Sequence, residues 1–466
     1  MAIERGVLDR LTEIVGEGNI YTEDEDLASY AYDATSLWVH PPDVVVLPTD
    51  AEQIASIMKL ANEHKVPVTP RGGGTNVSGG SVPIQGGIVL VTTRMNKILE
   101  ISKENMVAIV EPGVVLMNLN MALAKEGLMF PPDPQSFVGA TLGGIVAENS
   151  GGPAGLKYGV TKHYVLGLEW VLPEGEIIQI GATTSKNRTG YDLPMLFTGS
   201  EGTLGVMTKA ILKLIPRPPA ARTMAAVFPD VAGAGELVFK VLQEGIVPGK
   251  IELLDNWVIN RIEEMMPMGL PTDADAMLLF EIDGAKEAVD AELEAVSEIC
   301  TRNGATKVMV AETPDEAMKY WNARKAGFAA VFGKAATTLA EDVTVPRDRI
   351  PDLIRVCKDL EKETGIEIVI LGHAGDGNLH PALLTDQQDE EHFALAQKTM
   401  HRIFEAAMEM GGVVSGEHGV GLEKKQFMSK AVSPRVLQIM RDIKALLDPN
   451  GIMNPGKIWE DADGDA

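Results

Sequence analysis

The sequence predicts an α+β protein with two main domains. Glycine-rich loops after short strands fill the first half of the chain, whereas strands alternate with long helices in the second half. Between these halves lies Pro216-Arg217-Pro218-Pro219, which is typical of a domain boundary. A chain of 466 residues also exceeds what one hydrophobic core usually organises. We expect a first domain over 1–219, a second over 220–420, a C-terminal segment over 421–459 and a disordered acidic tail over 460–466.

The first domain opens with strands at 44–47 and 66–69, joined by a helix that Thr49 or Asp50 caps. The loop Arg71–Gly80 follows and contains three successive glycines, whose N–H groups can surround a pyrophosphate. It lacks the ending of a P-loop and the spacing of a Rossmann turn, so an ordinary NTPase or nicotinamide fold is disfavoured. The alternative is a flexible loop without a ligand.

Further glycine loops follow at Thr141–Gly144, Asn149–Gly152, Gly155–Gly159 and Gly199–Gly205, with a hairpin over 165–181 among them. Because glycine permits close backbone approach, these loops suggest a long ligand that runs through the first domain. A dinucleotide would fit.

The second domain alternates strands with helices. Strands are expected at 223–228, 276–282 and 307–311, and helices at 233–244 and 286–302. This order predicts helices on one face of a mainly antiparallel sheet.

Two histidines flank a predicted turn in this domain. His373 and His380 lie between strand-like runs at 366–371 and 381–384, and Gly375 and Gly377 favour chain reversal. Cross-strand neighbours lie about 5 Å apart, close enough for two imidazoles to hold one metal ion. The alternative is a turn with a hydrogen-bonded core histidine.

An acid and a third histidine follow. A helix over 389–410 precedes a short predicted strand over 413–419, which contains Glu417 and His418. If this strand returns beside the hairpin, the set becomes two histidines and a carboxylate, which recurs at divalent metal sites. The spacing matches neither a zinc finger nor HExxH.

The composition excludes several functions. A formal charge of −25 argues against nucleic acid or an anionic membrane surface as a partner, and an anionic substrate would need a local cationic pocket. Cys300 and Cys357 cannot supply a four-cysteine iron–sulfur cluster. The N-terminus lacks a signal pattern and no apolar run reaches 18 residues, so we expect a cytoplasmic protein without a membrane span.

Together these motifs resemble the FAD-binding family typified by vanillyl-alcohol oxidase, and within it the D-2-hydroxyacid dehydrogenases. The resemblance covers about residues 15–459. It implies a PCMH-type FAD-binding domain of two subdomains, a cap domain with an antiparallel sheet and helices, and a C-terminal segment that returns to the FAD domain. The segments that match in order are Arg71–Gly80, Asn149–Gly152, Gly199–Gly205, His373–His380, Gly416–Gly421 and Asn454–Lys457.

The resemblance also implies how FAD is held. Members with covalent flavin carry a histidine where this chain has Thr75, so FAD is expected to bind non-covalently. The implied FAD contacts are Pro70, Arg71, Gly72, Gly73, Gly74, Thr75, Asn76, Ser78, Gly79, Pro132, Asp133, Thr141, Gly143, Gly144, Asn149, Ser150, Gly151, Gly155, Tyr158, Glu201, Gly202, Val206 and Asn454.

By the same resemblance, His373, His380 and Glu417 are metal ligands, and His418 is the base beside the flavin. Zn²⁺, Fe²⁺ and Mn²⁺ all suit such a set. Arg324 resembles the arginine that binds the substrate carboxylate, for which its bidentate fork is apt; the alternative is a surface arginine.

The implied reaction is oxidation of a D-2-hydroxy acid to the 2-oxo acid, with hydride transfer to flavin N5. The stretch Leu339–Asp342 lacks the lysine typical of members that act on dicarboxylic acids, which favours D-lactate or glycolate over D-2-hydroxyglutarate. Similar members pass electrons to an electron-transferring flavoprotein, a quinone or an iron–sulfur subunit, and the first is favoured here. The alternatives are a redox-neutral ether-lipid synthase and an electron-relay subunit.

Overall fold

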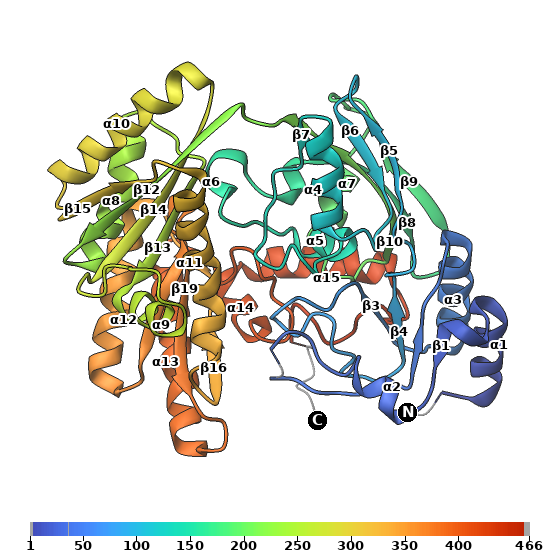
Figure 1. Cartoon of the computed structure of the whole chain (residues 1–466). Helices are drawn as coiled ribbons and strands as arrows, with labels where there is room; N and C mark the ends of the chain where they lie inside the picture. Colours follow the sequence, from blue (N-terminus) through green and yellow to red (C-terminus); the bar gives the residue numbers. More distant parts are fainter. Residues whose placement is uncertain (1–2, 36, 461–466) are drawn as a thin grey trace. The chain divides into compact units, whose positions relative to one another are not determined.

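The computed structural model describes residues 3–35 and 37–460 (Figure 1). Of the acidic tail expected at 460–466, residues 461–466 lie outside the described residues. The chain divides into two compact units. The first unit comprises the chain up to Ser150, Val160–Arg217 and the chain from Glu417 onward, and the second unit comprises Gly151–Gly159 and Pro218–Gly416.

The first unit contains a small sheet in the order β1-β2-β4-β3. Strands β2, β4 and β3 are parallel, and β1 is antiparallel to β2. Alternate residues of β2 pack on helices α1 and α3 or toward α2, so the strand is buried on both faces. The bounds are α1 (Arg5–Val15), β1 (Ile20–Tyr21), α2 (Asp24–Ala28), β2 (Val44–Val46), α3 (Ala51–His64), β3 (Val68–Arg71) and β4 (Ile88–Val91).

A second, antiparallel sheet of the first unit has the order β5-β6-β10-β8-β9. Its core gathers apolar side chains from the sheet, α4 and α5 around the buried Trp170. The hairpin expected over 165–181 is confirmed as β8 and β9. The bounds are β5 (Ile98–Ser102), β6 (Val107–Val110), α4 (Leu116–Lys125), β7 (Leu128–Met129), α5 (Leu142–Glu148), η2 (Thr161–His163), β8 (Val165–Val171), β9 (Ile177–Gly181), α7 (Leu193–Phe197), β10 (Val206–Lys213), β11 (Ile215–Pro216), η5 (Lys425–Phe427), α14 (Met428–Ala431) and α15 (Pro434–Leu447).

The second unit is organised by an antiparallel sheet in the order β15-β12-β14-β13-β18-β19-β16, with β17 also paired to β19. The bounds are α6 (Gly155–Tyr158), β12 (Ala220–Phe228), α8 (Val231–Gln243), β13 (Lys250–Asp255), α9 (Asn256–Met265), β14 (Ala276–Gly284), α10 (Lys286–Arg302), β15 (Lys307–Val310), α11 (Pro314–Phe332), β16 (Thr337–Ala340), β17 (Val343–Thr344), η3 (Arg347–Arg349), α12 (Ile350–Thr364), β18 (Ile368–His373), η4 (Ala374–Asp376), β19 (Asn378–Thr385) and α13 (Glu390–Glu409).

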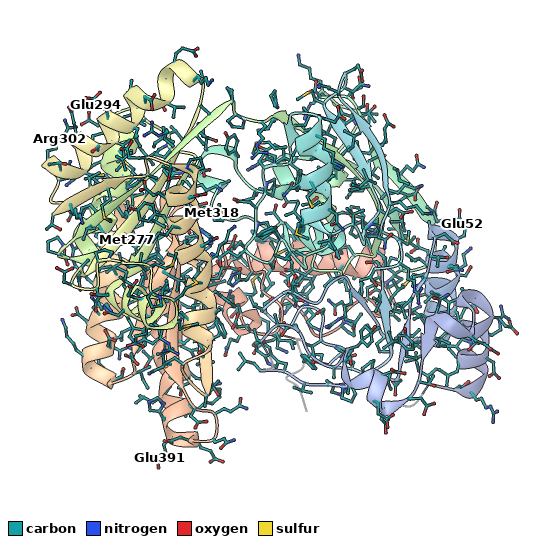
Figure 2. The ribbon with its side chains drawn as sticks, viewed as in Figure 1. Glu52, Met277, Glu294, Arg302, Met318 and Glu391 are labelled. Atoms are coloured by element: carbon teal, nitrogen blue, oxygen red, sulfur yellow. The ribbon has the colours of Figure 1, made fainter. Side chains whose placement is uncertain are left out.

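Helices cover both faces of this sheet, so the expectation of helices on one face was wrong. Helices α8, α10, α12 and α13 contact one face, and α9 and α11 pack on the other (Figure 1). Met277 of β14 lies in the α9–α11 core, whereas Met318 of α11 is 54% exposed (Figure 2). The run Ala276–Phe280 is apolar at every position and buried throughout, which is typical of a strand covered on both sides.

The strand expected over 413–419 does not form. Val413 makes an isolated antiparallel bridge to Thr344 of β17, and the residues after it are irregular. The neighbour of β19 at this end is therefore β17. Gly412, Gly416 and Gly419 give the segment too little side-chain surface to stabilise a ladder.

No helix in residues 3–35 and 37–460 is long and apolar enough to span a membrane.

Candidate active site

The glycine loop after β3 packs closely against the chain before α5. A Cβ atom added at Gly72 would lie 2.1 Å from Thr141 Oγ1, and one at Gly73 would lie 2.3 Å from the Gly139 carbonyl oxygen. Both distances are far below van der Waals contact, so this approach depends on glycine.

Polar side chains brace the same loop. Asp33 Oδ2 accepts hydrogen bonds from the Gly79 amide (2.7 Å) and from Asn76 Nδ2 (3.0 Å). Arg71 Nη1 donates to the Tyr32 carbonyl at 2.8 Å. Arg71 and Asn76 thus hold the loop's shape through their side chains. Asp33 was missed by the sequence analysis because it lies 43 residues from Asn76.

The C-terminal segment returns to this loop, as expected. Asn454 Nδ2 donates to the carbonyls of Gly80 and Glu201, both at 2.8 Å, and Met453 bridges Val68 of β3. Lys457 Nζ donates to the Val82 carbonyl at 2.6 Å, and burial lowers its pKa to about 7.

Two hydroxyl groups of the first unit suit a ligand. Thr141 Oγ1 and Ser200 Oγ are buried, and neither has a hydrogen-bond partner within residues 3–35 and 37–460. Buried hydroxyls without partners are costly unless a ligand or water completes them. Thr141 Oγ1 lies beside Gly72 of the glycine loop and has the hydrogen-bonding capacity that a pyrophosphate-bearing cofactor such as FAD would need.

The segment that carries His418 lies on the glycine loop. Ser78 Oγ donates to the His418 carbonyl at 3.0 Å, and Glu201 accepts from the amides of Val420 (2.8 Å) and Gly421 (2.7 Å). The position of His418 is therefore set by residues of the expected cofactor site.

Two acidic side chains lie beside this segment. Burial, then the charge of Glu201, raises the pKa of Glu148 well above its ordinary value. Burial also raises the pKa of Glu201, but the Val420 and Gly421 amides oppose that rise. Glu148 therefore stays protonated to higher pH than an ordinary glutamate, and the two amides favour the ionised form of Glu201.

In the second unit, β18 and β19 bring the two histidines together. The ring centroids of His373 and His380 are 5.1 Å apart. A ring nitrogen of His373 lies within 4.8 Å of a ring nitrogen of His380. The turn between them is η4 with Gly377 in the left-handed conformation (φ 88°).

The hydrogen bonds of both imidazoles favour metal binding through Nε2. His380 Nδ1 lies 3.1 Å from the Glu341 carbonyl oxygen, which can only accept, so Nδ1 carries the proton. His373 Nδ1 lies 2.8 Å from Glu252 Oε1. Metal-binding histidines commonly donate their other N–H to such groups, so this donor set fits a divalent ion.

Arg324 joins this cluster. It lies on α11, is 2% exposed, and donates from Nε to Glu252 Oε2 at 2.6 Å. The alternative of a surface arginine is therefore wrong. Burial alone would raise the pKa of Glu252, but the charges of His373 and Arg324 bring it below the ordinary value.

Asp342 is a further residue that the sequence analysis did not assign. It is fully buried and accepts from Ser415 Oγ (2.7 Å) and the Gly416 amide (2.9 Å). A ligand atom of Asp342 also lies within 4.8 Å of one of His380. The chain just before Glu417 is thereby tied to the histidine hairpin. The signal in the sequence was an acidic pair inside the stretch Leu339–Val343.

The remaining expected cofactor residues divide between the units. Gly151, Gly155 and Tyr158 belong to the second unit, where the Tyr158 hydroxyl donates to Asp283 Oδ2 at 2.6 Å. The others lie in the first unit: Pro70, Gly74, Thr75, Pro132, Asp133, Gly143, Gly144, Asn149, Ser150, Gly202 and Val206.

Comparison with known families agrees with this architecture. Residues 42–181 match the family described as FAD binding domain, and residues 217–458 match the C-terminal domain of FAD linked oxidases. The chain belongs to the FAD-linked oxidase family.

Two relatives of this FAD-linked oxidase align with it over nearly their whole length. A glycolate oxidase subunit of Bacillus subtilis is 40% identical, with 98% of this chain and 97% of the relative covered. A D-lactate dehydrogenase of Anaerostipes hadrus is 36% identical, with 97% of each chain covered.

Solved structures share the fold of the FAD-linked oxidase. A p-cresol methylhydroxylase matches with a TM-score of 0.83 at 20% identity, covering 100% of this chain and 99% of the other. An alkyldihydroxyacetonephosphate synthase matches with a TM-score of 0.77 at 21% identity, covering 98% and 86%. At these identities the likeness shows the fold alone.

Proposed function

We propose that this FAD-linked oxidase is a dehydrogenase of a D-2-hydroxy acid, with D-lactate favoured, and that it releases the 2-oxo acid. The observation that carries the proposal is the cluster of the buried residues His373, Glu252 and Arg324 with the half-buried His380. It combines two imidazoles that can bind a metal ion with a guanidinium that can bind a carboxylate. A 2-hydroxy acid presents a hydroxyl group to such a metal ion and a carboxylate to such a guanidinium. The relatives named for glycolate and D-lactate support the same substrate class.

The proposed metal ligands are His373, His380 and Glu417, with Zn²⁺, Fe²⁺ or Mn²⁺ as the ion. The support for Glu417 comes from the chain itself. It follows Gly416 by one peptide bond, and the Gly416 amide is fixed to Asp342, which neighbours His380.

FAD, bound non-covalently, would supply a hydride acceptor, and the metal ion would supply a positive charge beside the substrate hydroxyl. His418 takes the proton from the substrate hydroxyl oxygen as general base, while the hydride leaves the carbon that bears this hydroxyl. Arg324 binds the substrate carboxylate and thereby fixes the orientation of the substrate's single C2–H bond. The Ser78–His418 contact holds the base on the cofactor loop.

The electrons would then pass to an external carrier, for which we favour an electron-transferring flavoprotein. The two cysteines of the chain are both buried and cannot form an iron–sulfur cluster here. Purified protein should reduce such a flavoprotein in the presence of D-lactate. Reaction with a quinone or an iron–sulfur partner alone would contradict this choice.

The test of the substrate is anaerobic flavin bleaching. Protein loaded with FAD and Zn²⁺, Fe²⁺ or Mn²⁺ is mixed with D-lactate, L-lactate, glycolate or D-2-hydroxyglutarate, and the flavin absorbance is followed. We expect bleaching by D-lactate that is lost on chelation. Bleaching by glycolate or D-2-hydroxyglutarate alone would reassign the substrate. A flavin that no hydroxy acid bleaches would favour a redox-neutral synthase or an electron-relay subunit.

The test of the base is His418→Ala. The variant should keep FAD, but its flavin should be reduced about 10³-fold more slowly, since general base catalysis is worth about 10²–10⁴. His64→Ala, at the exposed end of α3, is the control and should behave as wild type. Bleaching of the His418 variant at the normal rate would remove this role.

A further inference from the structure

Glu252 of β13 is a buried carboxylate whose two oxygens serve two different residues. Oε1 lies 2.8 Å from His373 Nδ1, and Oε2 accepts from Arg324 Nε at 2.6 Å. Its exposed fraction is 0%, and those of His373 and Arg324 are each 2%. The three residues come from β13, β18 and α11, so the contact is formed by tertiary packing alone.

Apolar side chains share the face of the sheet that carries Glu252. Leu254 lies two residues further along β13, Leu279 is the register partner of Glu252 on β14, and both belong with Leu371 to the α9–α11 core. An ionised carboxylate at such a position is costly unless it is paired and hydrogen-bonded. Both partners of Glu252 belong to the substrate and metal site proposed above. A purely structural role would be served better by an apolar residue of similar size.

We propose that Glu252 is the positioning residue that joins the metal site to the substrate-carboxylate site. This inference rests on the proposed function, because it takes His373 as a metal ligand and Arg324 as the carboxylate-binding group. Glu252 accepts the Nδ1 proton of His373, which leaves Nε2 as the metal-binding nitrogen and fixes the plane of the ring. The same carboxylate accepts from Arg324 Nε, which fixes the orientation of the planar guanidinium group that is proposed to bind the substrate carboxylate.

The arrangement predicts that metal affinity and substrate affinity fall together when Glu252 changes. With glutamine at position 252, the side chain can present an N–H to His373, which favours the tautomer with its proton on Nε2. The variant also lacks the charge that holds Arg324.

The test uses the full chain loaded with FAD and compares Glu252→Gln with Asp255→Asn. Asp255 is the matched control, because it lies on the same strand, is 2% exposed, and bonds the amides of Val258 and Ile370. Zn²⁺ affinity is measured by equilibrium dialysis against a metal buffer, and the Co²⁺ absorption spectrum reports the ligand geometry. Kinetics with D-lactate separate kcat from KM.

We expect Glu252→Gln to weaken Zn²⁺ binding by about 10–100-fold and to alter the Co²⁺ spectrum, while FAD content stays at wild type. KM for D-lactate should also rise, and adding Arg324→Lys to Glu252→Gln should change it less than Arg324→Lys does alone. Asp255→Asn should lower the melting temperature but leave Zn²⁺ affinity within about threefold. Wild-type Zn²⁺ affinity in Glu252→Gln would overturn the inference.

Two further variants separate the possible failures. If Glu252→Gln does not fold, Glu252→Asp keeps the charge but shortens the side chain, and it should show a weaker loss of Zn²⁺ affinity; no loss would overturn the inference. His373→Ala tests the metal site itself. If it binds Zn²⁺ as wild type does, the proposed metal site is wrong and the inference falls with it. Loss of Zn²⁺ in His373→Ala with none in Glu252→Gln would reject the positioning role alone.

Discussion

The two units build their candidate sites from different materials. In the first unit, glycine backbone packs against backbone at Gly73 and Gly139, and side chains such as Asp33 and Asn454 hold the loops in place. In the second unit, buried imidazole, carboxylate and guanidinium groups face one another directly. The difference teaches that a large cofactor can be held by a shaped backbone, whereas a small anion and a metal ion need charged side chains at fixed positions.

The largest effect should follow from a change in the side-chain site. His380→Ala removes a proposed metal ligand, so Zn²⁺ affinity and flavin reduction by D-lactate should each fall by more than about 100-fold, with FAD still bound. Equilibrium dialysis measures the Zn²⁺ affinity, and anaerobic stopped-flow absorbance measures the rate of flavin reduction. His392→Ala, on α13 with its ring bonded to Thr385, is the control. If His380→Ala lost FAD instead, it would be wrong to assign FAD binding mainly to the first unit and metal binding to the histidines of the second unit.

A smaller effect should follow from a change in the backbone site. The Cβ of Gly73→Ala would lie 2.3 Å from a carbonyl oxygen, so the loop must shift. Overpacking of about 1–3 kcal/mol corresponds to roughly 10–100-fold weaker FAD binding, with Zn²⁺ affinity unchanged. Fluorescence titration of the apoprotein with FAD measures it. Gly18→Ala is the control, since no atom lies within 4 Å of the added carbon. Equal FAD affinity in both variants would contradict the close-packed cradle.

Lys457 is a buried titratable side chain in the first unit, whose candidate site is otherwise built mainly from backbone. It should make the free energy of unfolding depend on pH. Its folded pKa is about 7, and the unfolded value is about 10.4, so the unfolded chain binds more protons between these values. The free energy of unfolding should therefore rise by on the order of 2 kcal/mol from pH 7 to 9 through this group.

Urea denaturation at pH 7 and 9 tests this for wild type and Lys457→Met. The variant should lack that part of the rise. An equal rise in the free energy of unfolding from pH 7 to 9 in both proteins would mean that Lys457 stays protonated in the folded state.

The smallest effect is expected at the thiols of the second unit. Burial raises the pKa of Cys300 and of Cys357 to about 12, and both pack inside the helical layers. Iodoacetamide at pH 8 should leave native protein unmodified and fully active, as mass spectrometry would show. Rapid labelling would indicate that α10 or α12 opens, and that the second unit is less rigid than its core suggests.

Local patterns made much of the fold predictable. Asp50 caps α3 through the Gln53 amide, and α10 and α13 lie within a residue of their expected bounds, because caps and apolar periodicity act over a few residues. The prediction of a strand over 413–419 was wrong, since Gly416, Gly419 and the contact with Asp342 outweigh the two valines at its start. Strand β13 and helix α9 had no expected counterpart, although β13 carries Glu252.

The sequence by itself determined the glycine loops, the histidine hairpin and the family, because each depends on residues that are close along the chain. The tertiary structure decided which charged groups meet. Glu252 lies 121 residues from His373 and 72 from Arg324, and Asp342 lies 74 from Gly416. No local pattern encodes such pairs, since they form only when strands and helices pack into one core and the buried charges must find partners.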